Sequence, residues 1–422
     1  MDTNLSSYDL VIKDGWVIDP SQSLNGYFDV AVSNGKIIAV AKQLTNYKAK
    51  QTVIASDYIV CPGLIDLHTH VYEWVTNFGL PADDAGIHSG STTVVDQGSS
   101  SHFNFSGFKS NIVDKVKTDV RCFLSVNIGT NKALDITGAC FDSPKNINID
   151  AIVHLAEEYP EIIRGFKVFA DSGSISRWGM SVMELSREIG LRTGLPLYVH
   201  TGELFPVVEA HRPSPEQVVE KVVSYMKVGD ILGHCYSCQP DGVMGRRTKV
   251  PNWLLQAIER GVLLDLGHGL KFSFDIARLM IEQGVLPYTI SSDVHGDFFT
   301  LHDDSHLNYS LCGAISKLMA LGLDLISAIS YVTINPARIL KAEPEIGTLK
   351  IGSRADISVL NLVEGCWLFF DSMGKQVIAK QKLAPVWVVR SGELIQPHCR
   401  LLRDLEYRCS EIDVTNQDLC IA

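Results

Sequence analysis

The apolar run Leu64-Ile65-Asp66-Leu67, followed directly by His68-Thr69-His70, is the first of eight runs that share one arrangement. In each, a short apolar stretch leads into a polar or glycine-bearing tip and then into a longer helical stretch. The first run begins near residue 58, and the other seven cover residues 92–96, 121–126, 162–168, 196–200, 230–234, 261–266 and 288–293. Eight such units, spaced by roughly 30 residues, predict an α/β fold in which parallel strands close into a (β/α)8 TIM barrel. An open doubly wound sheet is the competing architecture, but eight consecutive parallel strands close more naturally than they stay open.

The two ends of the chain have a different pattern. Residues 9–60 form short strand-like runs separated by Asp-Gly, Asn-Gly and Pro-Ser turn signals, and residues 355–360, 384–389 and 392–395 return to the same pattern. We therefore expect residues 1–60 and 346–396 to pair into a small β-sandwich domain beside a barrel of residues 61–345. Residues 397–422 are polar, contain three cysteines and are predicted to be a C-terminal tail.

Composition excludes several classes of protein. The 422 residues are 46% hydrophobic and 20% charged, which is typical of a globular chain. The net charge is −11 and no basic block exceeds Arg246-Arg247, so we expect no nucleic-acid partner. No apolar run approaches the roughly 18 to 20 residues of a membrane span. The beginning Met1-Asp2-Thr3-Asn4 lacks the pattern of a signal peptide. These observations predict a cytoplasmic protein with no membrane partner and with mostly reduced cysteines.

A set of histidines marks the strand tips. His68 and His70 stand at i and i+2 of one strand, so both imidazoles can face the barrel mouth and share a metal ion. His200, His234 and Asp293 end three further strands. All would lie at the carboxyl end of the barrel, where barrel enzymes place their catalytic groups. A metal site at the mouth is therefore the prediction. The alternative for an isolated HxH, two polar residues at a strand tip, is weakened because the pattern recurs.

Lys167 lies inside the apolar run Gly165-Phe166-Lys167-Val168-Phe169, where burying an ammonium ion is costly. Desolvation and a nearby metal charge would hold the amine neutral, and a neutral amine can capture carbon dioxide as a carbamate. A carbamate offers two oxygens and can bridge two cations. The alternative for Lys167 is a snorkelling or salt-bridged lysine.

These residues carry a family resemblance. The stretch Cys61-Pro62-Gly63-Leu64-Ile65-Asp66-Leu67-His68-Thr69-His70, with the later strand tips and the closing Thr333-Ile334-Asn335-Pro336-Ala337, resembles the amidohydrolase superfamily, in its binuclear type with a carboxylated lysine. Within that superfamily, the tips of strands two, seven and eight are similar to those of the dihydroorotase-like amidohydrolase and deacetylase group. The resemblance covers essentially residues 9–396.

The resemblance implies two metal sites. His68, His70, Lys167 and Asp293 would hold the more buried ion, and Lys167, His200 and His234 the more exposed one. This chain departs from the pattern of the group at Val168-Phe169-Ala170, because the group usually has a small or basic pair of residues after the lysine of strand four. Zinc is the default metal, although manganese, cobalt and iron suit the same ligands.

The predicted mechanism is metal-assisted hydrolysis of a carbon–nitrogen bond. A hydroxide bridging the two ions forms at neutral pH because the cations depress the pKa of bound water from about 15.7 toward 7. One ion polarises the scissile carbonyl. Asp293 takes the hydroxide proton during attack and passes it to the departing nitrogen.

Residues that bind the substrate are less defined by the sequence. His268 and His295 lie at the tips of strands seven and eight and are candidates, as is Tyr72 in the first loop after a barrel strand. Each has an equally simple structural explanation as a packed or hydrogen-bonded side chain. Arg246 and Arg247 could clamp a carboxylate, but a solvated loop is the simpler interpretation. The CxxC pair Cys235 and Cys238 lacks the second pair that zinc or redox chemistry would require.

Several functions remain open at this point. The first is an N-acyl deacetylase, and the second is a cyclic amidohydrolase that opens or closes a dihydropyrimidine or hydantoin ring. The third is a non-catalytic relative, which would be expected to have lost metal ligands, whereas every ligand position is filled. A deaminase is related in its chemistry, although mononuclear deaminases normally lack the lysine of strand four. Barrels of this size often pair, so a homo-oligomer is also expected.

Overall fold

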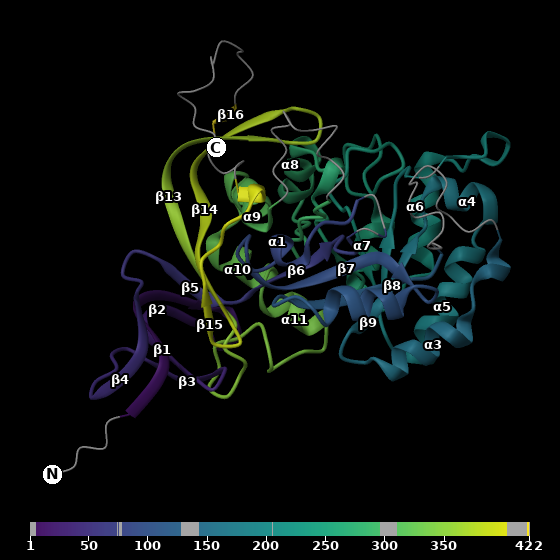
Figure 1. Ribbon diagram of the computed structural model, residues 1–422. Coiled ribbons are helices and arrows are strands. Elements are labelled where there is room, and N and C mark those ends of the chain that lie inside the picture. Colours follow the sequence, from purple (N-terminus) through teal and green to yellow (C-terminus); the bar gives the residue numbers. More distant parts are fainter. Residues whose placement is uncertain are drawn as a thin grey trace.

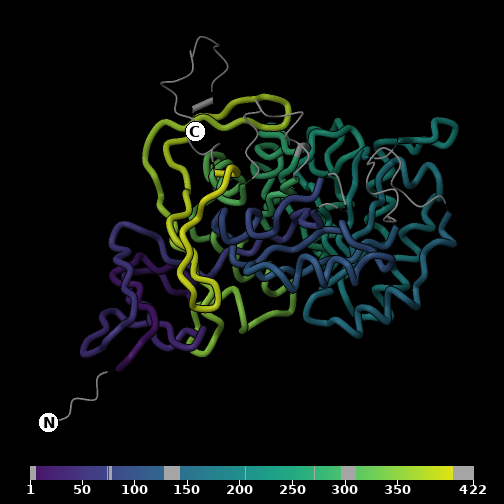
Figure 2. The backbone as a smooth tube through the Cα atoms, in the orientation of Figure 1, coloured from purple at the N-terminus to yellow at the C-terminus, as the bar shows by residue number. Residues whose placement is uncertain are grey.

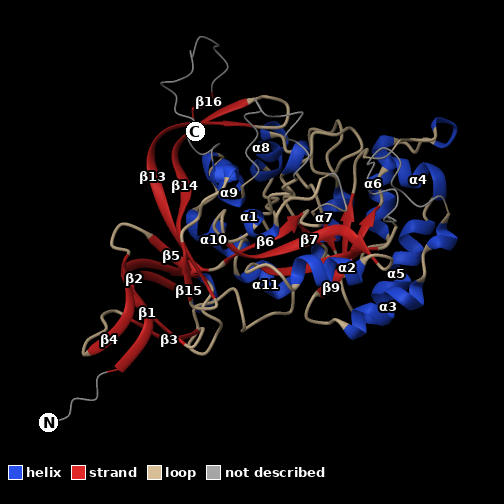
Figure 3. Cartoon of the chain, in the orientation of Figure 1, coloured by secondary structure: helices blue, strands red, loops and turns tan. Residues whose placement is uncertain are grey.

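The computed structural model describes residues 6–402, except Trp74, Thr76, Asn77, 128–142, Phe205 and 296–309, together with the backbone of residues 420–421. A barrel and a separate β-sheet at its side make up the molecule (Figure 1). In Figure 3 the strands of the terminal sheet lie on one side, and most helices surround the barrel. The fold class expected from the sequence is confirmed.

Seven parallel strands form most of the barrel, in the order β12-β11-β10-β9-β8-β7-β6. They are β6 (Leu64–Thr69), β7 (Ser91–Ser101), β8 (Asp119–Ser125), β9 (Ile163–Phe169), β10 (Leu197–His200), β11 (Ile231–Leu232) and β12 (Leu263–Leu264).

An eighth segment closes the ring. Thr289 pairs in parallel with Asp265 beyond β12, and Val294 pairs in parallel with Thr69 of β6. The Asp293 amide donates to the His68 carbonyl at 2.8 Å, so this segment continues the sheet between the first and last strands. The eight predicted runs therefore occupy the eight positions of one barrel.

Helices cover the outside of the barrel and one of its ends. They are α1 (Ala82–Ala85), α2 (Phe105–Phe108), α3 (Ile149–Glu158), α4 (Ser172–Trp178), α5 (Ser181–Thr193), α6 (Pro215–Ser224), α7 (Asn252–Glu259), α8 (Phe274–Glu282), α9 (Leu311–Ala320), α10 (Leu325–Tyr331) and α11 (Ile334–Ile339), with short helical turns at η1 (Pro20–Gln22), η2 (Lys109–Val113), η4 (Pro144–Asn146), η5 (Glu209–His211) and η6 (Gly269–Lys271). Helix α6 shows why such segments are helical: its buried Val218, Val219, Val222 and Val223 form one apolar stripe. Residues of α11 pack against inward-facing residues of the strands, including Ile65 and Phe123, and fill the end opposite the mouth.

The terminal segments form one nine-stranded sheet. Its strands are β1 (Ser6–Asp19), β2 (Leu24–Ser33), β3 (Lys36–Ala41), β4 (Tyr47–Ile54), β5 (Ile59–Pro62), β13 (Ile357–Phe370), β14 (Gln376–Arg390), β15 (Glu393–Ile395) and β16 (Cys420–Ile421). Two strands pair in parallel with the same edge of β1: β4 pairs with its first half, up to Lys13, and β5 pairs with Trp16 and Val17. β5 in turn pairs with β13, so strands from the N-terminal and C-terminal segments lie side by side in one sheet (Figure 2). A buried cluster containing Leu10, Val30 and Ile357 gives this unit its own core.

The structure differs from the sequence-based strands in three places. The run at residues 58–67 is split at Gly63: β5 belongs to the terminal sheet and β6 to the barrel. β13 and β14 are much longer than expected and form a ribbon whose turn, at Asp371 and Ser372, reaches the loop before α8. Of the expected tail, residues 397–402 are described and residues 420–421 return to pair with β14, while 403–419 and 422 lie outside the described residues. The described helices include none with the length and apolar character that a bilayer span requires.

Candidate metal centre

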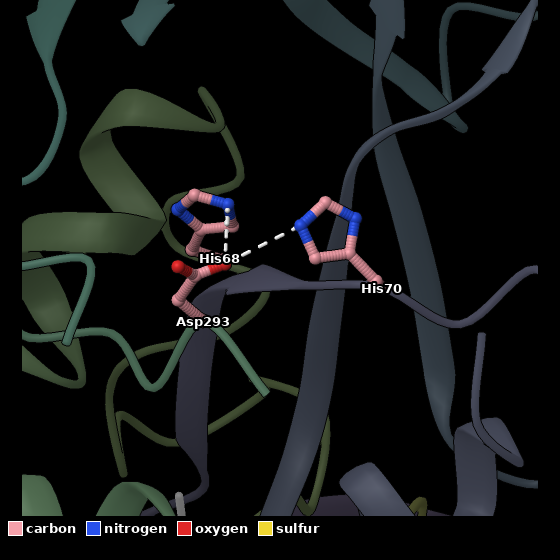
Figure 4. Close-up of side chains that lie close together, drawn as sticks. All are labelled: His68, His70 and Asp293. Atoms are coloured by element: carbon pink, nitrogen blue, oxygen red, sulfur yellow. Dashed lines mark ion pairs between the residues drawn. The ribbon is translucent and has the colours of Figure 1, made fainter. Parts of the chain in front are cut away.

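Three predicted ligands meet at the carboxyl end of the barrel. His68 is the second-last residue of β6, His70 follows that strand, and Asp293 stands in the segment that closes the ring. His68 Nε2 lies 3.0 Å and His70 Nε2 lies 3.3 Å from the same Asp293 oxygen, Oδ1 (Figure 4). Their ligand atoms all lie within 4.8 Å of one another, and all three residues are buried. The i and i+2 spacing therefore does place both imidazoles on one side of the strand.

Hydrogen bonds fix which nitrogen of His68 carries the proton. The Tyr198 hydroxyl donates to Asp265 Oδ2 at 2.6 Å, so its oxygen accepts from His68 Nδ1 at 2.9 Å. This leaves the lone pair of His68 Nε2 facing Asp293. A lone pair and a carboxylate oxygen at 3.0 Å repel each other unless a cation lies beside them. Such a histidine with an oriented second nitrogen is the usual ligand arrangement in metal sites.

His200 and His234 form a second pair at the tips of β10 and β11. His234 Nδ1 donates to the Gly267 carbonyl at 2.7 Å, which leaves its Nε2 unprotonated. That nitrogen lies 2.9 Å from Nδ1 of His200. This is the distance of a hydrogen bond between the two rings, and their role as ligands of a second ion stays a prediction.

Lys167 lies beside the first pair. Its side chain is fully buried in β9, and Nζ lies 3.2 Å from His68 Nε2 and 4.4 Å from the centre of the Tyr198 ring. Among the described residues no carboxylate lies within ion-pair distance of Nζ. Burial lowers the pKa of Lys167 to about 7, and the charge of Asp293 opposes part of that shift. A neutral amine is therefore readily available, which fits the carbamate predicted from the sequence.

Burial keeps the histidines neutral as well. It lowers the pKa of His68, His70 and His200 well below the ordinary value of 6.5, and it lowers the pKa of His234 to about 3. Positive charge on Lys167 adds to the shift for His68 and His70, and Lys271 adds to it for His200. Neutral imidazoles are the form that binds metals.

Two of these residues have strained backbones. His234 has φ of 58° and Asp293 has φ of 52°, in the left-handed region that residues other than glycine seldom adopt. Such conformations persist at functional sites because the surroundings hold them. Gly269 is part of those surroundings: a Cβ there would lie 2.1 Å from Asp293 Oδ2. Only glycine at this position lets the η6 turn approach the carboxylate.

The three predicted substrate contacts lie in different surroundings. The His295 ring stacks on His70 with centroids 4.5 Å apart, and its Nε2 lies 3.6 Å from Asp293 Oδ1, so His295 borders the metal centre. His268 is fully buried, with Nε2 2.8 Å from Lys317 Nζ and its ring stacked on Phe272. Tyr72 is 3% exposed and its hydroxyl donates to the Asn104 carbonyl at 3.1 Å. His268 and Tyr72 thus have the packing environment that was their alternative explanation. Their substrate roles stay predictions.

The remaining sequence candidates lie elsewhere. Arg247 donates to the Glu216 carbonyl, and Arg246 is exposed. Cys235 and Cys238 are free thiols. They do not belong to the metal-type cluster that the described part of the chain contains, which is His68, His70 and Asp293.

The sequence did not identify two features of the site. One is the chain of hydrogen bonds from His68 through Tyr198 to Asp265, which Thr289 and Ser291 extend. The other is Lys271, whose Nζ lies 2.7 Å from His200 Nε2. Burial lowers the pKa of Lys271 to about 8. Tyr198 lies in a predicted strand two residues before His200, so strand alternation could have placed it on the same side.

Comparison with known proteins finds amidohydrolase relatives. A model of the Amidohydrolase family matches residues 251–395. A deacetylase from Agrobacterium fabrum is 28% identical over 367 residues, covering 86% of this chain and 85% of the relative. A dihydroorotase from Aquifex aeolicus is 25% identical over 430 residues, covering 92% of this chain and 96% of the relative.

Structural comparison agrees. The crystal structure of a dihydroorotase superposes with a TM-score of 0.78 and 26% identity, over 92% of this chain and 99% of the other. The residues that converge at the barrel mouth are of the types that bind divalent metals. The resemblance seen at the strand tips is confirmed: the chain is similar to enzymes of the amidohydrolase superfamily, and these relatives indicate a hydrolase that acts on carbon–nitrogen bonds other than peptide bonds.

Proposed function

We propose that the enzyme is an N-acyl deacetylase that hydrolyses the amide bond of a small molecule with the help of two divalent ions. The observation that carries the proposal is that two histidine pairs meet at the barrel mouth, with Lys167 Nζ 3.2 Å from His68 and the rings of His68 and His234 5.2 Å apart. The deacetylase relatives support a linear acyl compound as the substrate.

The two ions would have different numbers of protein ligands, and the Lys167 carbamate would be a ligand of both. His68, His70, Asp293 and the carbamate of Lys167 would hold one ion, and the same carbamate with His200 and His234 would hold the other. Carbon dioxide forms the carbamate by adding to the neutral Lys167 amine, which loses a proton. Zinc remains the expected metal because imidazole and carboxylate ligands suit it. When bound, such ions polarise a carbonyl oxygen and make water a better nucleophile at neutral pH.

Asp293 would carry the proton transfer. Its carboxylate is 5% exposed and is held by the left-handed backbone of the closing segment, so its position is fixed relative to the histidines. It takes a proton from the attacking water and delivers it to the departing nitrogen, which leaves as an amine while the acyl group leaves as a carboxylic acid. Proton transfer by a positioned group is typically worth about 10² to 10⁴ in rate.

A second candidate is a cyclic amidohydrolase of the dihydroorotase or hydantoinase kind. The dihydroorotase relatives match nearly the whole chain, and the same groups would open a cyclic amide. Purified enzyme should be assayed on N-acetyl amino acids, dihydroorotate and hydantoins, with products identified by mass. Release of acetate supports the deacetylase, whereas ring opening without acetate release supports the alternative.

The expectations about cellular context are proposals of the same kind. We expect a cytoplasmic enzyme that forms a homo-oligomer and has no nucleic-acid or membrane partner. Fractionation and light scattering of the native protein test these points.

A further inference from the structure

A cavity lies at the end of the barrel opposite the metal centre. It has a volume of about 390 Å³ and is lined by α5, α11 and the residues at the start of three barrel strands. Pro196 precedes β10, Asp230 precedes β11, and Leu263 is the first residue of β12. Because the strands are parallel, their amino ends lie at the end of the barrel away from the mouth. The cavity is therefore separate from the site proposed for hydrolysis.

Three cationic side chains line this cavity. They are Arg187 of α5, Arg338 of α11 and Lys341, which follows α11, and Asp230 is the one carboxylate among the lining residues. The whole chain has a net charge of −11, so this excess of positive charge is a local feature. Like charges around one cavity repel each other, and an anion between them would relieve the repulsion.

Asp230 does not neutralise the three cations. Its Oδ1 accepts a hydrogen bond from the Leu197 amide at 2.9 Å, and its Oδ2 accepts from the Lys227 amide at 2.7 Å and from Arg187 Nη1 at 2.5 Å. The carboxylate is thus occupied by one guanidinium nitrogen and two backbone amides. Within the described residues it forms no ion pair with the cations contributed by α11 and the residue after it.

Each cation keeps hydrogen-bond donors that the described chain does not use. The second guanidinium nitrogen of Arg187, Nη2, lies over Gly190, where a Cβ would collide with it, and no described residue accepts a hydrogen bond from it. Arg338 is half-exposed, and its Nε lies 3.5 Å from Glu343 Oε1, which is longer than an ordinary hydrogen bond. Lys341 Nζ donates one of its three protons to the Gly194 carbonyl at 3.1 Å.

The backbone of Lys341 has a conformation that favours glycine. Its φ is 48°, and it follows Leu340, the residue that caps α11. Helices often end with a left-handed residue at this position, and that residue is usually glycine because it has no Cβ. Lysine here costs conformational energy but supplies a cation at the cavity. Residues held in such conformations cluster at sites that clamp ligands.

The rest of the wall is largely apolar. Leu195, Leu263 and Ile339 line the cavity, together with the ring of Tyr288 and with Val228, which is 78% exposed. A ligand that fits both parts of the wall has an anionic group and an organic body.

We propose that this cavity binds a phosphate monoester of a small organic molecule, with the phosphate at Arg187, Arg338 and Lys341. Planar guanidinium groups donate paired hydrogen bonds to phosphate oxygens, and the ammonium adds a point charge. The volume lies within the range of about 300 to 1,000 Å³ that is typical of small-molecule sites. The inference does not depend on the proposed function, because the cavity lies at the other end of the barrel.

Calorimetry with phenyl phosphate, inorganic phosphate and phenol tests the proposal. It should be done at about 0.15 M salt, where long-range attraction between exposed charges is screened. Arg338→Gln and Lys341→Gly each remove one cation, and glycine suits the left-handed backbone at residue 341. Each variant should raise the Kd for phenyl phosphate about 10-fold or more, because a charge-assisted hydrogen bond is lost. Arg246→Gln, at an exposed arginine, is the matched control and should bind like the wild type. Circular dichroism checks that the variants fold.

The outcomes separate this cavity from the barrel mouth. Phenyl phosphate should bind the wild type more tightly than inorganic phosphate does, and phenol should not bind. Asp293→Asn should leave this binding unchanged. Binding that Asp293→Asn weakens and the two cavity variants retain would place the phosphate at the metal centre and overturn the inference. Equal affinity for inorganic phosphate and phenyl phosphate would reject the ester as the ligand.

Discussion

The hydroxyl of Tyr198 lies 2.9 Å from Nδ1 of His68, and the two residues stand on β10 and β6, across the interior of the barrel. The same hydroxyl donates to Asp265, so a buried carboxylate orients the imidazole of His68, a proposed metal ligand, through a tyrosine. Because this contact fixes the proton on Nδ1, it keeps Nε2 available as a ligand.

Tyr198→Phe tests that relationship. It removes the hydroxyl and keeps the ring, and loss of a group that orients a ligand is expected to weaken metal affinity about 10- to 100-fold. Tyr236→Phe is the control, because that buried hydroxyl donates to the Val285 carbonyl instead of to a ligand. Metal affinity measured by competition with a chelator should fall for the first variant alone. Equal affinities would show that Tyr198 does not orient His68.

Asp293→Asn tests the proton-transfer role. The amide keeps the size of the side chain but cannot accept the proton, so turnover should fall by about 10² or more while the fold persists. Activity, circular dichroism and metal content should be measured together. Turnover like that of the wild type would remove Asp293 from the mechanism.

Lys167→Arg tests the carbamate. A guanidinium does not add carbon dioxide, so the variant should retain fewer ions than the wild type and show no hydrolysis. The wild type loaded with ¹³C-bicarbonate should give a carbamate resonance that Lys167→Arg lacks. The absence of that resonance in metal-loaded wild type would leave Lys167 as an ordinary buried amine.

Gly269→Ala tests the close approach of η6 to the carboxylate. The new methyl group would lie 2.1 Å from Asp293 Oδ2, at a φ of 38°, so Asp293 must move and hydrolysis should fall. Gly284→Ala is a matched control, since its φ is 78° but no heavy atom lies within 4 Å of the added Cβ. If the two variants have the same activity, the close contact between η6 and Asp293 does not explain the requirement for glycine at position 269.

Asp119 lies away from the metal centre, and we expect Asp119→Asn to lower the stability of the fold in a pH-dependent way. Burial raises the pKa of Asp119, but Arg121, Arg354 and Arg390 outweigh that effect and lower it from 3.8 to about 2. The lowered pKa means that the folded state favours the carboxylate. Its stabilisation is therefore present above pH 3.8 and is lost as the pH falls toward 2. Urea denaturation should show the variant to be less stable at pH 7, with the difference shrinking across that acidic range. A difference that stays constant with pH would contradict the charge-based explanation.

Much of the barrel and its mouth could be predicted from the sequence because strand ends carry a local signal. An apolar run fixes a strand, and the residue at its tip, such as His200 or His234, must then face the mouth. Residues 58–67 were predicted as one barrel run, whereas the structure divides them between two sheets, because β5 and β6 are both apolar and only Gly63 separates them. The ribbon of β13 and β14 was missed because its middle, around Glu364 and Gly365, is polar and exposed.

Contacts that depend on side-chain direction could not be predicted. His268 and Lys271 stand on the same short segment, yet the first turns inward to Lys317 and the second reaches His200. Sequence spacing does not distinguish them, because the direction of each side chain depends on the η6 turn and on the ribbon that holds it.

The central claim is that six side chains hold two divalent ions. The most direct measurement is the number of ions per chain, by elemental analysis of active enzyme purified without added metal. The account predicts two per chain for the wild type. Full hydrolytic activity with a single ion per chain, or with none, would contradict it.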